Sequence, residues 1–138
     1  MVHLGLVVSQ FNKHDPITEE MELHAREAAA ASDAIIVETL SVPGSYDTPL
    51  AADRLARRED IDAVAVLGAI VSGDTDHDQV IGHAVADGLT RVSLDRDTPV
   101  TMGVIGPGMS ADEARARVEY GATAVESAIE MVTELEEQ

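Results

Sequence analysis

The sequence predicts a doubly wound α/β fold, in which four parallel strands lie between two layers of helices. Segments of strand length and segments with helical spacing alternate four times along the 138 residues. The third strand segment, 61–71, is almost continuously apolar, which is typical of a strand buried on both faces of a parallel sheet. Consecutive parallel strands are joined by helices that cross over the sheet, and strands and helices that alternate with short connections are typical of a sheet with helices on both faces. We therefore expect one three-layer α/β/α domain over residues 1–138.

The first half of the chain holds two strand–helix units. The strand segments are short apolar runs, and the second is rich in β-branched residues and ended by Pro43-Gly44. Both helix segments begin with an N-cap residue followed by proline, a pair favoured in the first turn of a helix. The predicted elements are strand 2–9, helix Asp15 to about Ser32, strand 34–42 and helix Thr48 to about Arg58.

The second half repeats this pattern. A capping box, Ser110 to Glu113, starts the last helix, whose apolar residues recur every three or four positions as far as Val132. Gly106-Pro107-Gly108 is expected to end the strand before it. The predicted elements are strand 61–71, helix Asp76 to about Leu94, strand 98–105 and the helix that carries Ala114 to Val132.

The chain is strongly acidic. It has 26 Asp and Glu against 9 Lys and Arg, a net charge of −17, and Lys13 is its one lysine. Such a surface repels nucleic acid and anionic membranes. Intrinsic disorder is a poor alternative, because 45% of the residues are hydrophobic and clearly periodic. We interpret the charge as an adaptation to high salt, in which counterions screen the repulsion.

Other compositional features narrow the class of protein. The absence of cysteine excludes disulfides and thiolate metal sites. No apolar run approaches the roughly 20 residues that span a bilayer, and the N-terminal residues do not have the pattern of a signal peptide. We expect a soluble cytoplasmic protein.

The unusual residues of the chain all follow predicted strands. In a doubly wound sheet, ligands bind beyond the carboxyl ends of the strands. Polar or glycine-rich stretches occur at all four of these ends, at 10–12, 43–47, 73–77 and 106–109. This placement predicts a small-molecule site.

The stretch Gly73 to His77 precedes the third helix and has the strongest chemical signal. Free backbone N–H groups at a helix start favour a phosphate, although three nearby aspartates require a compensating cation, for which Arg117 is the candidate. Asp76 and Asp78 flank His77 and favour its imidazolium form, which suits proton transfer near neutrality. The alternatives are a surface histidine and a solvated arginine. A metal site is disfavoured, because adjacent residues on a helix do not face one another. His83 is expected to be a packed helix residue.

Two other strand ends could contact a substrate. Phe11, the one phenylalanine, lies beside Asn12 and could stack on a flat heterocycle or simply pack in a turn. The backbone of 43–47 and the side chain of Asp47 could bind polyol hydroxyls, or the proline and glycine could merely form a turn with Thr48 as N-cap.

Taken together, these stretches resemble the lumazine synthase family, particularly its archaeal members. The resemblance spans nearly the whole chain and rests on five motifs in register, which are Phe11-Asn12, V-P-G-S-Y-D-T-P-L-A-A at 42–52, L-G-A-I-V-S-G-D-T-D-H at 67–77, P-V-T-M-G-V at 99–104, and the helix with Arg117. It departs from bacterial members at Asp78-Gln79-Val80, where these have an aromatic residue, an acid and tyrosine, and at Met102, where they often have phenylalanine.

The resemblance implies a flavodoxin-like fold and a condensation reaction. The substrates would be 5-amino-6-(D-ribitylamino)uracil and 3,4-dihydroxy-2-butanone 4-phosphate. The amine forms an imine with the ketone, phosphate is eliminated, the ring closes and water leaves. No metal and no organic cofactor are implied.

The resemblance also implies roles for individual residues. Phe11 would stack on the pyrimidine, and His77 would move protons. Met102 would come from a neighbouring subunit. The remaining implied contacts are Ser45 and Asp47 with the ribityl chain, Ala69 and Ile70 backbone groups with the uracil edge, Asp74, Thr75 and Arg117 with the phosphate, and Asn12, Gly44, Tyr46 and Val71 elsewhere around the substrate.

Members of this family form pentamers with active sites between subunits, and some assemble into decamers or icosahedral shells of sixty subunits. Three rival interpretations remain open. The first is the archaeal riboflavin synthase, which shares the fold and uses two lumazine molecules. The others are a flavin-binding module of flavodoxin type without catalysis and a shell protein with a vestigial pocket.

Overall fold

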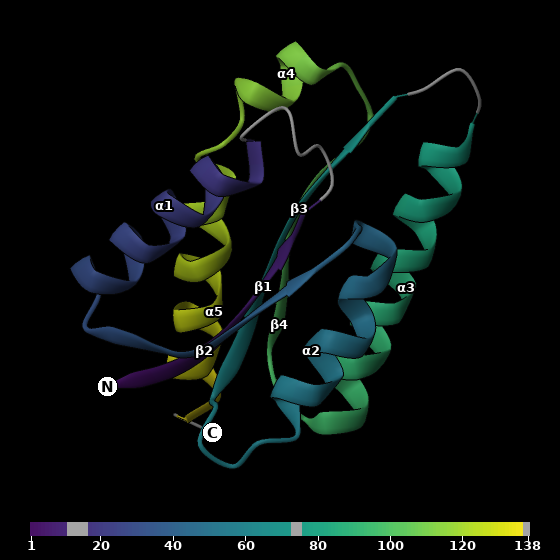
Figure 1. Ribbon diagram of the computed structural model, residues 1–138. Coiled ribbons are helices and arrows are strands. Elements are labelled where there is room, and N and C mark those ends of the chain that lie inside the picture. Colours follow the sequence, from purple (N-terminus) through teal and green to yellow (C-terminus); the bar gives the residue numbers. More distant parts are fainter. Residues whose placement is uncertain (11–16, 73–75, 137–138) are drawn as a thin grey trace.

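The four strands form one parallel sheet in the order β2-β1-β3-β4 (Figure 1). The computed structural model describes residues 1–10, 17–72 and 76–136. In chain order the elements are β1 (Val2–Ser9), α1 (Ile17–Ala31), β2 (Ala34–Val42), the 3₁₀ turn η1 (Ser45–Asp47), α2 (Thr48–Ala56), β3 (Ala63–Val71), α3 (His77–Arg96), β4 (Val100–Met109), α4 (Ala111–Arg115) and α5 (Tyr120–Glu136).

Helices cover both faces of the sheet. Helices α1 and α5 pack on one face, and α2 and α3 on the other (Figure 1). Each face has its own apolar core, and β3 contributes alternate residues to both, with all of its residues buried except Val71. The predicted three-layer, doubly wound α/β fold is confirmed. The apolar run at β3 is continuous because the strand is buried on both faces of the sheet, as predicted.

The end of β4 differs from the prediction. The strand continues through Gly106-Pro107-Gly108 to Met109, whereas we expected these residues to end it. The β3–β4 register shifts here, because Ala69 pairs with Ile105 but Val71 pairs with Met109. The segment is a bulge on an edge strand, where proline is tolerated because no strand in the described part of the chain pairs with the outer side of β4. Gly106 and Gly108 have φ values of 91° and 84°, which suit glycine.

The predicted last helix is two helices. The capping box is confirmed, since Ser110 and Glu113 exchange hydrogen bonds, but it begins the short helix α4. The chain then turns before α5, and a Cβ at Gly121 would meet the carbonyl of Met21 in α1. The prediction that Arg117 lies on a helix is therefore wrong, because this residue belongs to the turn between α4 and α5. Apolar spacing is similar on both sides of the turn and did not reveal it.

Smaller differences from the prediction concern single residues. The second helix has Asp47 rather than Thr48 as its N-cap, and the Thr48 hydroxyl instead donates to the Ser45 carbonyl at 2.7 Å. His83, which we expected to be packed, is exposed on α3. The predicted start of the first helix at Asp15 lies outside the described residues.

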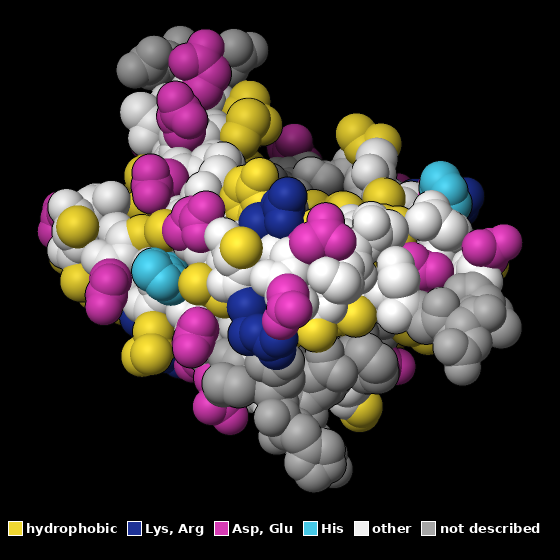
Figure 2. Space-filling view, turned by 90° about the horizontal axis from the view of Figure 1, so that it is seen from above, with side chains coloured by type: hydrophobic (Ala, Val, Ile, Leu, Met, Phe, Trp, Pro, Cys, Tyr) yellow, Lys and Arg dark blue, Asp and Glu magenta, His cyan; other side chains and the backbone are white. Residues whose placement is uncertain are grey.

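Acidic side chains are spread over the face at the carboxyl ends of the strands, with basic side chains in a few places (Figure 2). Several arginines form exposed ion pairs, such as Arg96 with Asp53 and Arg58 with both Glu38 and Asp60. The Arg96 guanidinium hydrogen-bonds Asp53 and lowers the pKa of this carboxyl. Exposed pairs contribute at most about 1 kcal/mol each, so they offset little of the repulsion among the remaining acids. Within the described part of the chain, no helix is long and apolar enough to cross a membrane.

Candidate active site at the strand ends and the free edge of the sheet

The connection after β2 is a compact turn closed by its own hydrogen bonds. The Gly44 N–H donates to Asp47 Oδ2 at 3.0 Å, and the Asp47 N–H donates to the Gly44 carbonyl at 3.0 Å. Tyr46 points outward and is 67% exposed. The turn therefore presents Tyr46 to the surface and holds Asp47 at the carboxyl end of the sheet, with one carboxylate oxygen engaged.

Two serine hydroxyls are buried beneath this turn. Ser9 ends β1 and Ser45 follows β2, and neither Oγ has a hydrogen-bond partner among the described residues. Gly68 of β3 makes room for both, because a Cβ there would lie 2.9 Å from Ser45 Oγ and 3.3 Å from Ser9 Cβ. An unsatisfied buried hydroxyl costs about 1–3 kcal/mol. Hydroxyls left in this state are a signal that a polar ligand or water completes them.

Sequence reasoning included Ser45 and missed Ser9. The available signal was position, because Ser9 is the polar residue that ends an otherwise apolar strand. Sequence reasoning instead selected Phe11 and Asn12, which follow Ser9 and are more conspicuous. These two predicted residues lie outside the part of the chain that the structure describes, so their stacking and contact roles stay predictions.

At the end of β3, the side that faces β1 has no strand partner in the described part of the chain. β3 pairs with β4 as far as Val71, but its pairing with β1 ends at Leu67. Among the described residues, no strand therefore pairs with the β1 side of Ala69 and Ile70, whose own side chains are buried. An N–H and a C=O left without a strand partner in this way can pair with the edge of a planar heterocycle, as a neighbouring strand would.

His77 is the first residue of α3 and is exposed, with Asp76 as N-cap. The next residue, Asp78, is buried and accepts hydrogen bonds from the Gly108 N–H at 3.1 Å and from Ser72 Oγ at 3.4 Å. The two aspartates beside His77 thus have different surroundings.

The predicted phosphate-binding residues Asp74 and Thr75 lie outside the described residues. Among the described residues, no three potential metal ligands lie together. Asp74 lies outside these residues, so the absence of a metal site stays a prediction.

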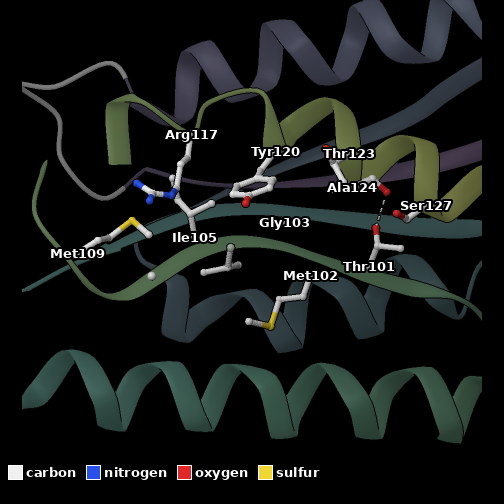
Figure 3. Close-up of a pocket in the computed structure, with 12 residues that line it drawn as sticks. Thr101, Met102, Gly103, Ile105, Met109, Arg117, Tyr120, Thr123, Ala124 and Ser127 are labelled. Carbon is white, nitrogen blue, oxygen red and sulfur yellow. Dashed lines mark hydrogen bonds between the residues drawn. The ribbon is translucent and has the colours of Figure 1, made fainter. Parts of the chain in front are cut away.

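A groove of about 560 Å³ lies between the edge strand β4 and α5 (Figure 3). Arg117 lies near Met109 at one end, Tyr120 lies in the middle, and Thr101 is at the other end, where its hydroxyl donates to the Ala124 carbonyl at 2.8 Å. Among the described residues that line this groove, Arg117 is the one basic residue. Its Nη1 donates to the Glu113 carbonyl at 2.8 Å, and within the described chain no carboxylate forms an ion pair with it.

The predicted site residues fall into two groups within one chain. Gly44 to Asp47, Ala69 to Val71 and His77 lie at the carboxyl ends of the strands. Arg117 lines the groove on the face that α5 covers, whereas α3 with His77 covers the opposite face. Met102 belongs to β4 at the border of this groove, and its side chain points toward α3 (Figure 3). The groove lining includes neither His77 nor any residue of the 43–47 turn.

A doubly wound parallel sheet with unsatisfied polar groups at its strand ends defines a small-molecule-binding α/β protein. A family model described as 6,7-dimethyl-8-ribityllumazine synthase matches residues 1–136. The chain belongs to this family of transferase-type enzymes of riboflavin biosynthesis, and the predicted family membership is confirmed.

Several curated relatives match over nearly their whole length. The chain is 68% identical to 6,7-dimethyl-8-ribityllumazine synthase of Halobacterium salinarum over 135 residues, which cover 98% of this chain and 100% of the relative. It is 66% identical to the Halorubrum lacusprofundi enzyme over 136 residues, with 99% and 100% coverage. The Methanosarcina barkeri enzyme is 45% identical over 134 residues, with 97% and 98% coverage.

Proposed function

We propose that this chain condenses 5-amino-6-(D-ribitylamino)uracil with 3,4-dihydroxy-2-butanone 4-phosphate to give 6,7-dimethyl-8-ribityllumazine, phosphate and water. The observation that carries the proposal is the match of residues 1–136 to this enzyme family, on a chain whose predicted site stretches fall at the carboxyl ends of the strands. The amine and the ketone condense to an imine with loss of one water, phosphate is eliminated, and the ring closes with loss of a second water. No cofactor and no metal enters this scheme.

The buried serines support a role in binding the ribityl chain. A polyol presents several hydroxyl groups, each of which can donate and accept a hydrogen bond. Ser9 and Ser45 hold two hydroxyls at the carboxyl end of the sheet that have no hydrogen-bond partner among the described residues. We place the ribityl chain beside the Gly44–Asp47 turn, where the free oxygen of Asp47 accepts a further hydrogen bond.

The unpaired side of β3 supports the position of the uracil ring. Backbone groups of Ala69 and Ile70 lie beyond the end of the β1 pairing and would bind the uracil edge. In this arrangement Val71 and Tyr46 border the ring, and Phe11 with Asn12 covers it.

The phosphate and the proton transfers involve the start of α3. We propose that N–H groups of Asp74 and Thr75, together with Arg117, bind the phosphate, and that His77 moves protons during imine formation and phosphate elimination. An exposed histidine at the helix start is accessible to a substrate held at the strand ends. General acid–base help of this kind is worth about 10²–10⁴-fold, and holding two substrates together contributes the remainder.

We propose that the complete site forms between subunits of a pentamer. Met102 was expected to come from a neighbouring subunit, and Arg117 lines the same groove and would come with it. No strand formed by the described residues pairs with the outer edge of β4, and Met102 and Tyr120 expose apolar surface beside it. An uncovered edge of this kind is a typical association surface. The strand ends of one subunit would then meet the β4–α5 groove of the next.

The first test mixes the purified wild-type protein with both substrates in molar salt. We expect the absorbance and green fluorescence of the lumazine product above the uncatalysed rate, together with released phosphate. Absence of product from folded, oligomeric protein would overturn the proposal. The same protein is then offered lumazine alone, which tests riboflavin synthesis, and free flavins, which test the binding-module interpretation.

We also propose that the enzyme is adapted to high salt. Its net charge is −17, and two of its close relatives come from Halobacterium and Halorubrum. Lowering the salt from 1 M to about 0.1 M lengthens the screening distance from about 3 Å to about 10 Å, which strengthens repulsion between surface carboxylates. The cytoplasmic location stays a prediction.

The expected result is a Tm that falls by several degrees as the salt is lowered, since each kcal/mol of lost stability lowers Tm by about 3 °C in a domain of this size. Calorimetry across a sodium chloride series at constant pH provides the measurement. A parallel series in sucrose, which strengthens burial without screening charge, is the control. A Tm independent of salt would contradict the proposed adaptation.

A further inference from the structure

The first turn of α3 is attached to the end of β4 by a buried carboxylate. Asp78 Oδ2 accepts the Gly108 N–H at 3.1 Å and the Ser72 hydroxyl at 3.4 Å. Ser72 is itself fixed to β4, because its N–H donates to the Met109 carbonyl at 2.8 Å. One side chain therefore connects the residue after β3, the bulge of β4 and the helix that begins with His77.

The bulge explains why a carboxylate is useful at this position. Three residues of β4, Gly106 to Gly108, lie opposite Ile70 between the pairs Ala69–Ile105 and Val71–Met109. A bulge leaves backbone groups outside the regular ladder. Asp78 accepts one of these, the Gly108 N–H. A second contact holds the same elements together, since a Cβ at Gly82 of α3 would lie 2.8 Å from the Pro107 ring.

The burial of Asp78 separates it from the other acids of this region. It is 8% exposed, whereas Asp76, two residues earlier, is exposed. Burying a carboxylate in a chain of net charge −17 is unfavourable unless hydrogen bonds and a favourable dipole offset it. The two donors and the N-terminal end of α3 provide both. Helix stabilisation alone does not require burial, because an exposed aspartate in the first turn interacts with the helix dipole equally well.

We propose that Asp78 is a positioning residue, which acts on the reaction by holding His77 at the carboxyl end of the sheet. The inference rests on the proposed function and extends it to a side chain that does not touch the substrate. The carboxylate fixes the first helical turn to Gly108 in the β4 bulge and to Ser72 after β3, and His77 precedes it directly in that turn. Misplacing a catalytic group by about 1 Å can cost about 10²-fold in rate.

The test is a double-mutant cycle on kcat, with the KM of each substrate measured alongside. We expect Asp78→Ala to lower kcat about tenfold, with the KM for the pyrimidine changed by less than about twofold. If Asp78 acts through His77, then adding Asp78→Ala to His77→Ala lowers kcat by less than about twofold, because the group to be positioned is already absent. A full tenfold further loss in the double variant would overturn the proposal.

Two further variants separate positioning from stability. Asp78→Asn keeps an oxygen that can accept the Gly108 N–H, so its kcat is expected to lie between those of wild type and Asp78→Ala. Asp87→Ala, on the exposed side of α3, removes the same charge from the same helix, and we expect kcat and both KM values of wild type. A lower Tm for Asp78→Ala with wild-type kcat in the folded fraction would show a structural role only and overturn the proposal.

The outcomes distinguish this inference from the proposed function. Lumazine formation by wild type with unchanged kinetics in both Asp78 variants contradicts the positioning role alone. Absence of lumazine formation by folded wild type contradicts the proposed function itself. If Asp78→Ala does not fold, Asp78→Asn replaces it in the cycle, with the same criterion of non-additivity.

Discussion

Replacing His77 with alanine is expected to lower kcat by about 10²-fold, with KM for either substrate changed by less than about threefold. The imidazole is exposed at the start of α3, so its removal leaves no cavity in the core. Binding groups at the strand ends remain in place. A loss confined to kcat is expected of a group that transfers protons in the transition state.

The measurement is steady-state lumazine formation with each substrate varied in turn. His83→Ala is the matched control, because it removes an exposed histidine from the same helix, six residues further on. It should retain the wild-type kcat, and both variants should keep the wild-type Tm and oligomeric state. An unchanged rate in His77→Ala would make proximity of the two substrates the whole mechanism.

The alternation of strand and helix segments was sufficient to predict the fold. The apolar run at 61–71 predicted a strand between two helical layers, and β3 lies in the interior of the sheet with both cores against it. The end of β4 was not predictable in this way. Gly106-Pro107-Gly108 has the composition of a turn, and only the position of β4 at the edge allows these residues to continue the strand as a bulge.

The site was predictable where functional residues lie close together in the sequence, and less so where it depends on contacts between residues that are far apart in the sequence. His77 and the Gly44–Asp47 turn are conspicuous in the sequence and lie at the strand ends. Asp76 and Asp78 look alike in sequence as flanking charges, but only Asp78 turns inward to Gly108, thirty residues away. A separation of this kind leaves no local pattern.

Replacing Arg117 with alanine is expected to raise KM for the butanone phosphate by about 10²-fold and KM for the pyrimidine by much less. A guanidinium has five N–H donors, and one of those of Arg117 is used on the Glu113 carbonyl. The remaining donors lie in the β4–α5 groove, whose lining, in the part of the chain described, contains no other basic residue. Charge-assisted hydrogen bonds to a phosphate are worth about 1.5–3 kcal/mol each, which sets the expected size.

Two variants calibrate this effect. Arg117→Lys keeps the charge and loses the planar fork, so its KM for the phosphate substrate should be intermediate. Arg115→Ala removes the same charge two residues away, from a side chain that pairs with Asp112, and we expect wild-type KM values for both substrates. Equal increases in the two KM values of Arg117→Ala would contradict a phosphate-binding role.

The position of Arg117 also allows the subunit arrangement to be tested by complementation. Within one chain, Arg117 and His77 lie on opposite faces of the sheet, and we propose that they meet only across a subunit boundary. Oligomers assembled from equal amounts of His77→Ala and Arg117→Ala subunits then contain some sites with both native residues. With random mixing, roughly a quarter of the sites are native, so activity should return to about that fraction of wild type. Mixed oligomers that remain as inactive as their parents would instead place both residues in the site of a single chain.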